Sequence, residues 1–120
     1  MERRHIVFYR SPSGRCPIEE FLDSLSSGEA KRIAWLLELL RDIEKIPESY
    51  LKKLQGTEGI WEGRVQFGSR SFRVLGFFLS GSRMVITHGF AKKSKKTPQR
   101  EIETAERFKR EYLDRANSHG

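Results

Sequence analysis

The amino-acid sequence predicts an α+β fold: a twisted antiparallel sheet with an N-terminal helical hairpin packed on one face, followed by a C-terminal helix. Apolar residues recur with a helical period within residues 17–49 and again after residue 98, and with a period of two within residues 60–91. The order of strand, two helices, three strands and helix indicates helices packed on one face of the sheet. The 120 residues, 37% of them hydrophobic, suit one domain spanning residues 1–120.

A first strand is predicted over His5–Arg10, where β-branched and aromatic residues are concentrated, and Ser11–Arg15 forms a turn after it. Pro17 suits the first turn of a helix, because its fixed φ and missing N–H are tolerated there. The apolar stripe of this helix consists of Ile18, Phe21, Leu22 and Leu25.

A second, longer helix is predicted to begin at Ser26, because Ser26 and Glu29 have the spacing of a capping box. Ile46–Ser49 ends this helix. Its buried face is predicted to consist of Ile33, Leu36, Leu37, Leu40 and Ile43. The two helices are expected to form an αα-hairpin.

Three strands of an antiparallel meander are predicted over Ile60–Phe67, Ser71–Leu79 and Arg83–Ala91. The turns between them are Gly68–Arg70 and Ser80–Ser82.

A last helix is predicted over Gln99 to about Ala116, with Thr97 and Pro98 as its cap and first turn. Its apolar positions are Ile102, Ala105, Phe108 and Tyr112.

Charge is divided unevenly along the chain. Residues 51–100 carry eleven Lys or Arg and two acidic residues, whereas residues 17–50 carry four basic and eight acidic residues. A basic half on a small domain indicates a surface that binds a polyanion, and phosphate is the expected target.

The single cysteine, Cys16, excludes an internal disulfide framework. Without an apolar run of membrane-spanning length or a signal peptide, the chain is expected to be a cytoplasmic protein that contacts no membrane.

Two arginines inside predicted strands are the first candidate site residues. If the turn pairs Phe67 with Arg70, Arg64 lies opposite Arg73, where like charges repel each other. A bound phosphate would reconcile the two, because two guanidinium groups can hold its oxygens. The alternative is a solvated face on which Glu62 forms a salt bridge.

A run of lysines follows the third strand of the meander: Lys92, Lys93, Lys95 and Lys96. Such a run can bind phosphates without reading sequence, and the alternative is a solvated loop.

His88 could serve as a general base or acid for RNA cleavage. Strand alternation places it with Met84, Ile86 and Phe90, which favours a hydrogen-bonded core histidine instead. Glu62 could act as a base, although an ion pair with Arg64 is the preferred interpretation.

The sequence has neither metal-ligand spacing nor a glycine-rich phosphate loop, so no metal and no small-molecule cofactor is expected.

The chain carries GIWEGRVQF, then FRVLGFF, then MVITHGFAKKSKKTP followed by a helix. With IVFY near the start and EEFL in the first helix, these segments resemble the HigB-type, phage-derived branch of the RelE/ParE toxin superfamily over nearly the whole chain. Gly63 and Thr87 depart from this pattern, since each stands where a bulky aliphatic residue is expected.

The resemblance implies a RelE-like fold and the toxin of a type II toxin–antitoxin pair, neutralised by an antitoxin that often has a helix-turn-helix domain. It implies a metal-independent endoribonuclease that cuts mRNA, with the ribosome as the expected partner. The expected catalytic residues are Arg64, Arg73, His88, Lys92 and Lys93. The expected RNA-binding residues are Lys52, Lys53, Arg70, Lys95 and Lys96. Two alternatives stay open: a ParE-like topoisomerase poison without nuclease activity, and a non-catalytic nucleic-acid-binding module.

Overall fold

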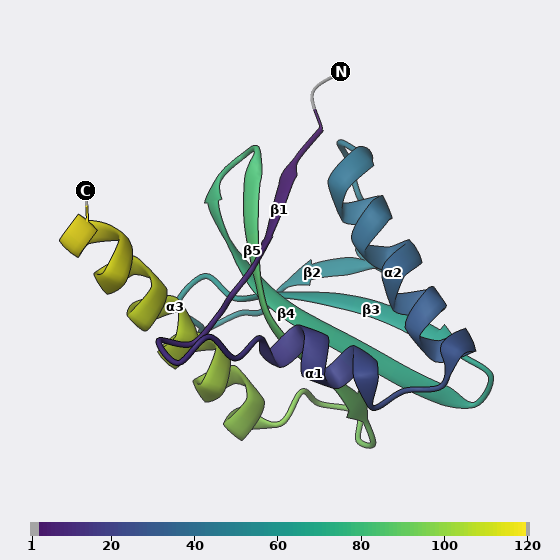
Figure 1. The fold of residues 1–120 in the computed structure, drawn as a ribbon. Helices are drawn as coiled ribbons and strands as arrows, with labels where there is room; N and C mark the ends of the chain where they lie inside the picture. Colours follow the sequence, from purple (N-terminus) through teal and green to yellow (C-terminus); the bar gives the residue numbers. More distant parts are fainter. Residues whose placement is uncertain (1–2, 120) are drawn as a thin grey trace.

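The computed structural model describes residues 3–119. Its elements, in chain order, are β1 (His5–Phe8), α1 (Pro17–Asp23), α2 (Ser27–Asp42), β2 (Leu51–Lys53), β3 (Trp61–Phe67), β4 (Arg70–Ser80), β5 (Arg83–Lys92) and α3 (Gln99–His119) (Figure 1). None of the helices in this part of the chain combines the length and the apolar character that crossing a membrane requires.

The five strands form one mixed sheet with the order β1-β5-β4-β3-β2. The antiparallel meander of β3, β4 and β5 is confirmed. The prediction of a wholly antiparallel sheet is wrong for β1, which pairs with β5 in parallel, His5 beside Arg83 and Phe8 beside Ile86. The composition of a segment shows that it is extended, whereas the direction of its pairing depends on the connection that follows, and here two helices and three strands intervene.

The strand β2 was not predicted from the sequence. It pairs antiparallel with β3, so that Leu51 lies beside Gly63 and Lys53 beside Trp61. Three residues are too few to show a period of two, and its lysines gave no strand signal of their own.

Helices cover both faces of the sheet, which corrects the prediction of a single covered face. On one face, α1 and α2 bury an apolar cluster that includes Ile18, Ile33, Leu36, Leu40, Val65, Phe72, Val74, Met84 and Ile86. On the other face, α3 packs on a second cluster that includes Tyr9, Ile60, Leu75, Phe77, Val85, Phe90 and Ala105. The strand β4 carries apolar side chains on both sides, and burying both requires a helix on each.

The capping box that begins α2 is confirmed: the Glu29 N–H donates to Ser26 Oγ at 3.2 Å, and the Ser26 N–H donates to Glu29 Oε1 at 3.0 Å. The predicted helical hairpin is corrected, because α1 packs mainly on β5 and α2 mainly on β3, with little contact between them. Ile43, predicted in the buried face of this helix, follows its last turn and is 41% exposed.

A β-bulge in β5 changes which face its residues occupy. His88 lies opposite Leu75 while Ile86 lies opposite Gly76, so Thr87 has no partner of its own on β4. The Thr87 hydroxyl donates to the Leu75 carbonyl oxygen at 3.0 Å. The predicted common face is therefore wrong: Met84 and Ile86 belong to the first cluster, whereas His88 lies on the side of α3.

Candidate functional site

Arg64 and Arg73 lie opposite each other on β3 and β4, as the predicted register requires. The two-residue turn that sets this register joins Phe67 to Arg70, with Gly68 at φ 61°. Strand alternation puts both arginines on the face of the sheet that α3 also covers. The turn and the alternating pattern thus bring two cationic side chains to one place.

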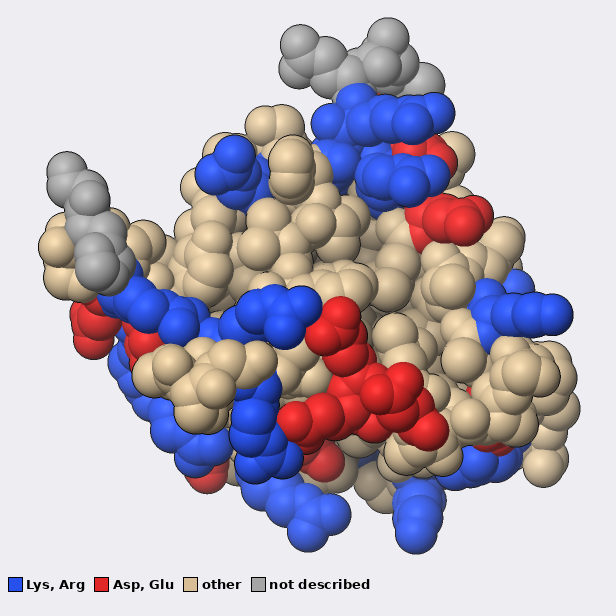
Figure 2. All heavy atoms as spheres, viewed as in Figure 1, with Lys and Arg blue, Asp and Glu red and all other residues tan. Residues whose placement is uncertain are grey.

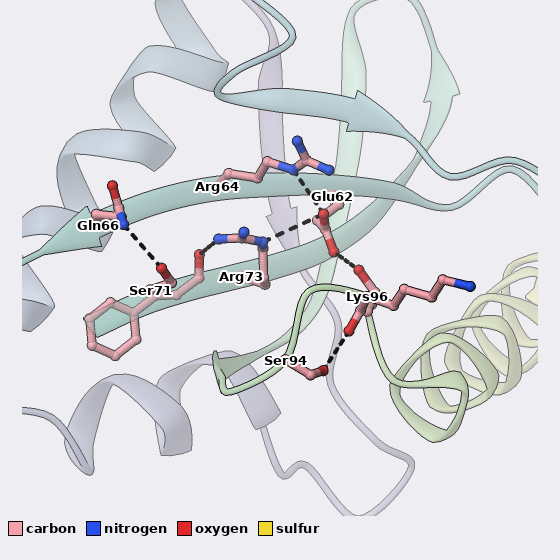
Figure 3. A network of polar contacts seen from close by, with 9 residues as sticks. Glu62, Arg64, Gln66, Ser71, Arg73, Ser94 and Lys96 are labelled. Atoms are coloured by element: carbon pink, nitrogen blue, oxygen red, sulfur yellow. Dashed lines mark hydrogen bonds and ion pairs between the residues drawn. The ribbon is translucent and has the colours of Figure 1, made fainter. Parts of the chain in front are cut away.

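Glu62 lies between the two arginines, and its carboxylate is fully buried (Figure 3). Its Oε1 accepts a hydrogen bond from Arg64 Nε at 2.9 Å and lies 3.5 Å from Arg73 Nε. Its Oε2 accepts from the Thr97 hydroxyl. The sequence suggested Thr97 as a helix cap, but α3 begins at Gln99 and the hydroxyl binds Glu62 instead.

Arg73 is held in an unusual setting for a guanidinium group, because its side chain is only 13% exposed. Burial holds the pKa of Arg73 below its ordinary value, and Arg64 acts in the same direction while Glu62 opposes them. Its Nη1 donates to the Phe72 carbonyl oxygen at 3.0 Å, whereas its buried Nε has no hydrogen-bond partner among the described residues. One carboxylate therefore offsets two guanidinium charges, and the site keeps a positive charge.

Two adjoining depressions of about 470 and 520 Å³ open beside the arginines. They share Lys92 and Lys95, and one of them contains Arg73 and the other Arg64. No acidic side chain of the described residues lines either depression. We define the basic face as the cationic residues that line them: Lys52, Lys53, Arg64, Arg73, Lys92, Lys93, Lys95 and Lys96. The structure thus brings together eight of the ten predicted site residues.

Lys92 lies close to the arginine pair. It ends β5, is partly buried, and lies beside Ser71 in the neighbouring strand. Burial lowers the pKa of Lys92, and Arg73 lowers it further. Lys92 shares a depression with Arg73, so it is the candidate general acid of this face.

His88 lies outside the basic face, beneath α3. Its Nε2 is 3.1 Å from Glu101 Oε1, and its Nδ1 is 3.1 Å from the Thr87 hydroxyl. Burial lowers the pKa of His88, and the contact with Glu101 acts in the opposite direction. Both ring nitrogens are engaged within the fold, as expected for a hydrogen-bonded core histidine.

Arg70, the other predicted site residue outside the basic face, points to the opposite side of the sheet. Its Nη1 lies 2.6 Å from Glu29 Oε2, and its guanidinium lies 5.0 Å from the ring centroid of Phe72. Arg70 precedes Arg73 by three positions on β4, an odd number, so their side chains lie on opposite faces of the sheet.

One cluster of acidic side chains lies over α1. Figure 2 shows them over α1, on the side where α1 covers the sheet. Glu19 and Glu20 are exposed there, at 3.1 Å from Arg10 and 2.8 Å from Arg15 respectively. In residues 3–119, no group of three His, Cys, Asp or Glu side chains is placed to hold a metal ion. The acidic residues of α1 thus lie on the face of the sheet opposite to Arg64 and Arg73, and two of them are paired with arginines.

Sequence reasoning missed two residues next to this site, Arg32 of α2 and Tyr50 before β2. Both line a third depression together with Arg64 and Arg73. Neither belongs to a local motif, and they reach the site only because α2 and the segment before β2 pack beside β3.

Residues 20–110 match the family described as phage derived protein Gp49-like (DUF891). The matched range contains all residues of the basic face. No curated protein matches the chain.

Proposed function

The chain belongs to the Gp49-like family of phage-derived proteins (DUF891), within the RelE/ParE-like toxin superfamily, and we propose that it is the toxin of a type II toxin–antitoxin system that cleaves mRNA. The proposed substrate is mRNA held by the ribosome, and the proposed partner is a cognate antitoxin with a helix-turn-helix domain. The assignment to the HigB-type branch is part of this proposal.

One observation is the main support for the proposed nuclease activity. Arg64 and Arg73 face each other on neighbouring strands and share a single buried carboxylate. Two guanidinium groups can hold the oxygens of one phosphate. Glu62 offsets part of their repulsion in the free protein, and the phosphate would offset the remainder. The basic face extends this charge along both sides of the pair, which suits a strand of linked phosphates.

The reaction that fits this site is attack of a ribose 2′-hydroxyl on the adjacent phosphorus. The 2′-oxygen forms a bond to phosphorus while the bond to the 5′-oxygen breaks, which leaves a 2′,3′-cyclic phosphate and a 5′-hydroxyl. Arg64 and Arg73 stabilise the charge that develops on the phosphate oxygens, a contribution worth on the order of 10²- to 10³-fold per donor in other enzymes.

Proton transfer in this proposal depends on Lys92, which protonates the departing 5′-oxygen. The proton of the 2′-hydroxyl passes to solvent. His88 would reach a substrate only if α3 moved, because its ring nitrogens bind Glu101 and Thr87. Modest acid–base catalysis is sufficient if the ribosome holds the attacking and leaving oxygens in line, because orientation alone can supply several kcal/mol.

The test is to induce the protein alone and map the 5′ ends of a reporter message by primer extension. New ends inside the translated region are expected, and they should be lost when the start codon of the reporter is removed. Arg73→Ala should abolish them, because it removes one of the two phosphate-binding groups. Growth arrest with intact messages would contradict the proposal and would favour a ParE-like poison of topoisomerase.

A further inference from the structure

A third depression, of about 490 Å³, adjoins the basic face where the sheet edge meets α2. Its lining includes Arg32, Tyr50, Arg64, Gln66, Ser71 and Arg73. It shares Arg64 and Arg73 with the depressions of the basic face, so a ligand bound to these arginines can enter it directly.

Flat side chains pack against one another in and behind the wall of this depression. The rings of Tyr50 and Trp35 meet edge to face, with centroids 5.3 Å apart. The Arg32 guanidinium lies 4.2 Å from the centroid of the Trp35 ring, and its Nε donates to the Gln66 carbonyl oxygen at 3.1 Å. Arg32 and Tyr50 are thus held in place by neighbours on α2 and β3.

The backbone fixes the position of Tyr50 relative to the arginine pair. The Arg64 N–H donates to the Tyr50 carbonyl oxygen at 2.8 Å, and the Tyr50 N–H donates to the Pro47 carbonyl oxygen at 2.9 Å. Tyr50, in the turn before β2, therefore lies beside Arg64 of β3, although it precedes it by 14 residues in the chain.

Burial in the hydrophobic core explains only part of the placement of Trp35 and Tyr50. Trp35 remains 38% exposed although it is the largest side chain of α2, and Tyr50 is half-buried. Flat aromatic and guanidinium surfaces beside a cationic site are the surfaces on which unpaired bases stack in single-stranded RNA complexes. Ser71 and Gln66, whose side chains lie 3.3 Å apart at the rim, offer a donor and acceptors to the edge of a base (Figure 3).

We propose that this depression binds one unstacked nucleobase of single-stranded RNA, next to the phosphate held by Arg64 and Arg73. Tyr50 is the stacking platform, and Ser71 and Gln66 contact the base edge. Trp35, against which Arg32 packs, holds Tyr50 from behind. The inference rests on the proposed function, because it assumes that the phosphate belongs to RNA. It adds a base-binding site, and hence a source of sequence preference, to a surface that otherwise contacts only the backbone.

The experiment compares two fluorescently labelled oligomers by anisotropy. One is a short single-stranded oligouridylate with 2′-fluoro groups, which cannot be cleaved, and the other is an abasic oligomer with the same number of phosphates. The native protein should bind the first about tenfold more tightly, the size of effect expected for one stacked base. Because both oligomers carry the same charge, the basic face contributes equally to both.

Variants of Tyr50 assign the difference to this depression. Tyr50→Leu should reduce the preference to less than about twofold while the abasic oligomer binds as before. Tyr50→Phe is the matched control and should keep the preference, because its ring has the same face. Trp35→Leu, which leaves Tyr50 in place without its support, should give an intermediate result. Thermal unfolding of each variant shows whether it folds.

Four outcomes would overturn the base site. They are equal affinity of the native protein for the two oligomers, an unchanged preference in Tyr50→Leu, a parallel loss of affinity for both oligomers in that variant, and no binding of either oligomer. The proposed nuclease is judged separately by the 5′ ends of the reporter message. New ends in cells together with any of these outcomes would remove the base site and leave the nuclease standing.

Discussion

Arg64 and Arg73 lie directly opposite each other on β3 and β4, and the fully buried carboxylate of Glu62 contacts both guanidinium groups. Like charges in this position would destabilise an antiparallel pair. The single carboxylate offsets part of that repulsion and leaves the pair positively charged. Fold stability and anion binding therefore depend on the same three side chains, and substitutions should affect the two properties in different directions.

Glu62→Gln removes the negative charge and keeps the shape of the side chain. The free energy of unfolding should fall by about 1–3 kcal/mol, because Arg64 and Arg73 lose the charge that offsets their repulsion. Affinity for single-stranded RNA should rise, because the net positive charge of the site increases. Urea unfolding and RNA binding measure the two effects. Glu103→Gln, an exposed position on α3, is the control for the change in total charge. Unchanged stability would show that Glu62 does not hold the arginines.

Arg73→Lys tests whether the guanidinium group matters beyond its charge. Cleavage should slow by on the order of 10²-fold or more, because an ammonium group cannot provide the paired donors that a phosphate accepts.

For Arg73→Ala, the sequence alone suggests that the side chain faces outward and that its removal changes the free energy of unfolding by less than about 0.5 kcal/mol. The structure buries most of Arg73, so Arg73→Ala should cost about 1–3 kcal/mol instead. A folded Arg73→Lys variant with full toxicity would exclude Arg73 from the chemistry.

The lysines of the basic face should divide into two groups. Replacing Lys95 and Lys96 with Gln should flatten the dependence of log K on log salt by about 0.7 for each lost contact, with little effect on cleavage at saturation. Replacing Lys92 and Lys93 should also lower the saturated rate, because Lys92 ends β5 close enough to Arg73 for that charge to lower the pKa of Lys92, and Lys93 follows it directly. Binding measured at several salt concentrations and single-turnover cleavage separate affinity from rate.

Arg70→Gln is the matched control for the lysine variants. Arg70 is paired with Glu29 on the opposite side of the sheet, so the salt dependence of RNA binding should not change. A decrease equal to that of the Lys95 and Lys96 variants would extend the RNA-binding surface to that side. Equal effects of both lysine pairs on the saturated rate would contradict the division between them.

His88 should make the protein less stable in mild acid. Burial lowers the pKa of its imidazole below the ordinary value of 6.5, so the unfolded chain takes up a proton at a higher pH than the folded protein does. This contribution to stability is complete above about pH 6.5 and is lost as the pH falls from there toward the folded-state pKa. Between about pH 8 and about pH 5, Tm should therefore fall less for His88→Gln than for the native protein.

The exposed His5 provides the control for this pH dependence. His5→Gln should leave the fall in Tm unchanged, because the histidine at that position is in contact with solvent in both states. If His88→Gln and the native protein lose Tm equally, a group other than His88 causes the acid sensitivity.

Local sequence patterns determined much of this protein. The turn at Gly68 and the alternation on either side of it were sufficient to predict that Arg64 faces Arg73, because a hairpin register depends on residues close together in the chain. The capping box of Ser26 and Glu29 was predicted for the same reason, since its two hydrogen bonds span three residues.

The tertiary structure alone decided the features that depend on contacts between distant segments. The side covered by α3 follows from burying the apolar side chains on both faces of β4, and no local pattern contains that requirement. The direction of β1 depends on the long connection between β1 and β5, and the bulge at Thr87 lies where β5 changes register against β4. The same packing turns His88 beneath α3 and brings Tyr50 beside Arg64. The sequence therefore determined which residues carry the charge, whereas the packing of helices on both faces decided which of them share a surface.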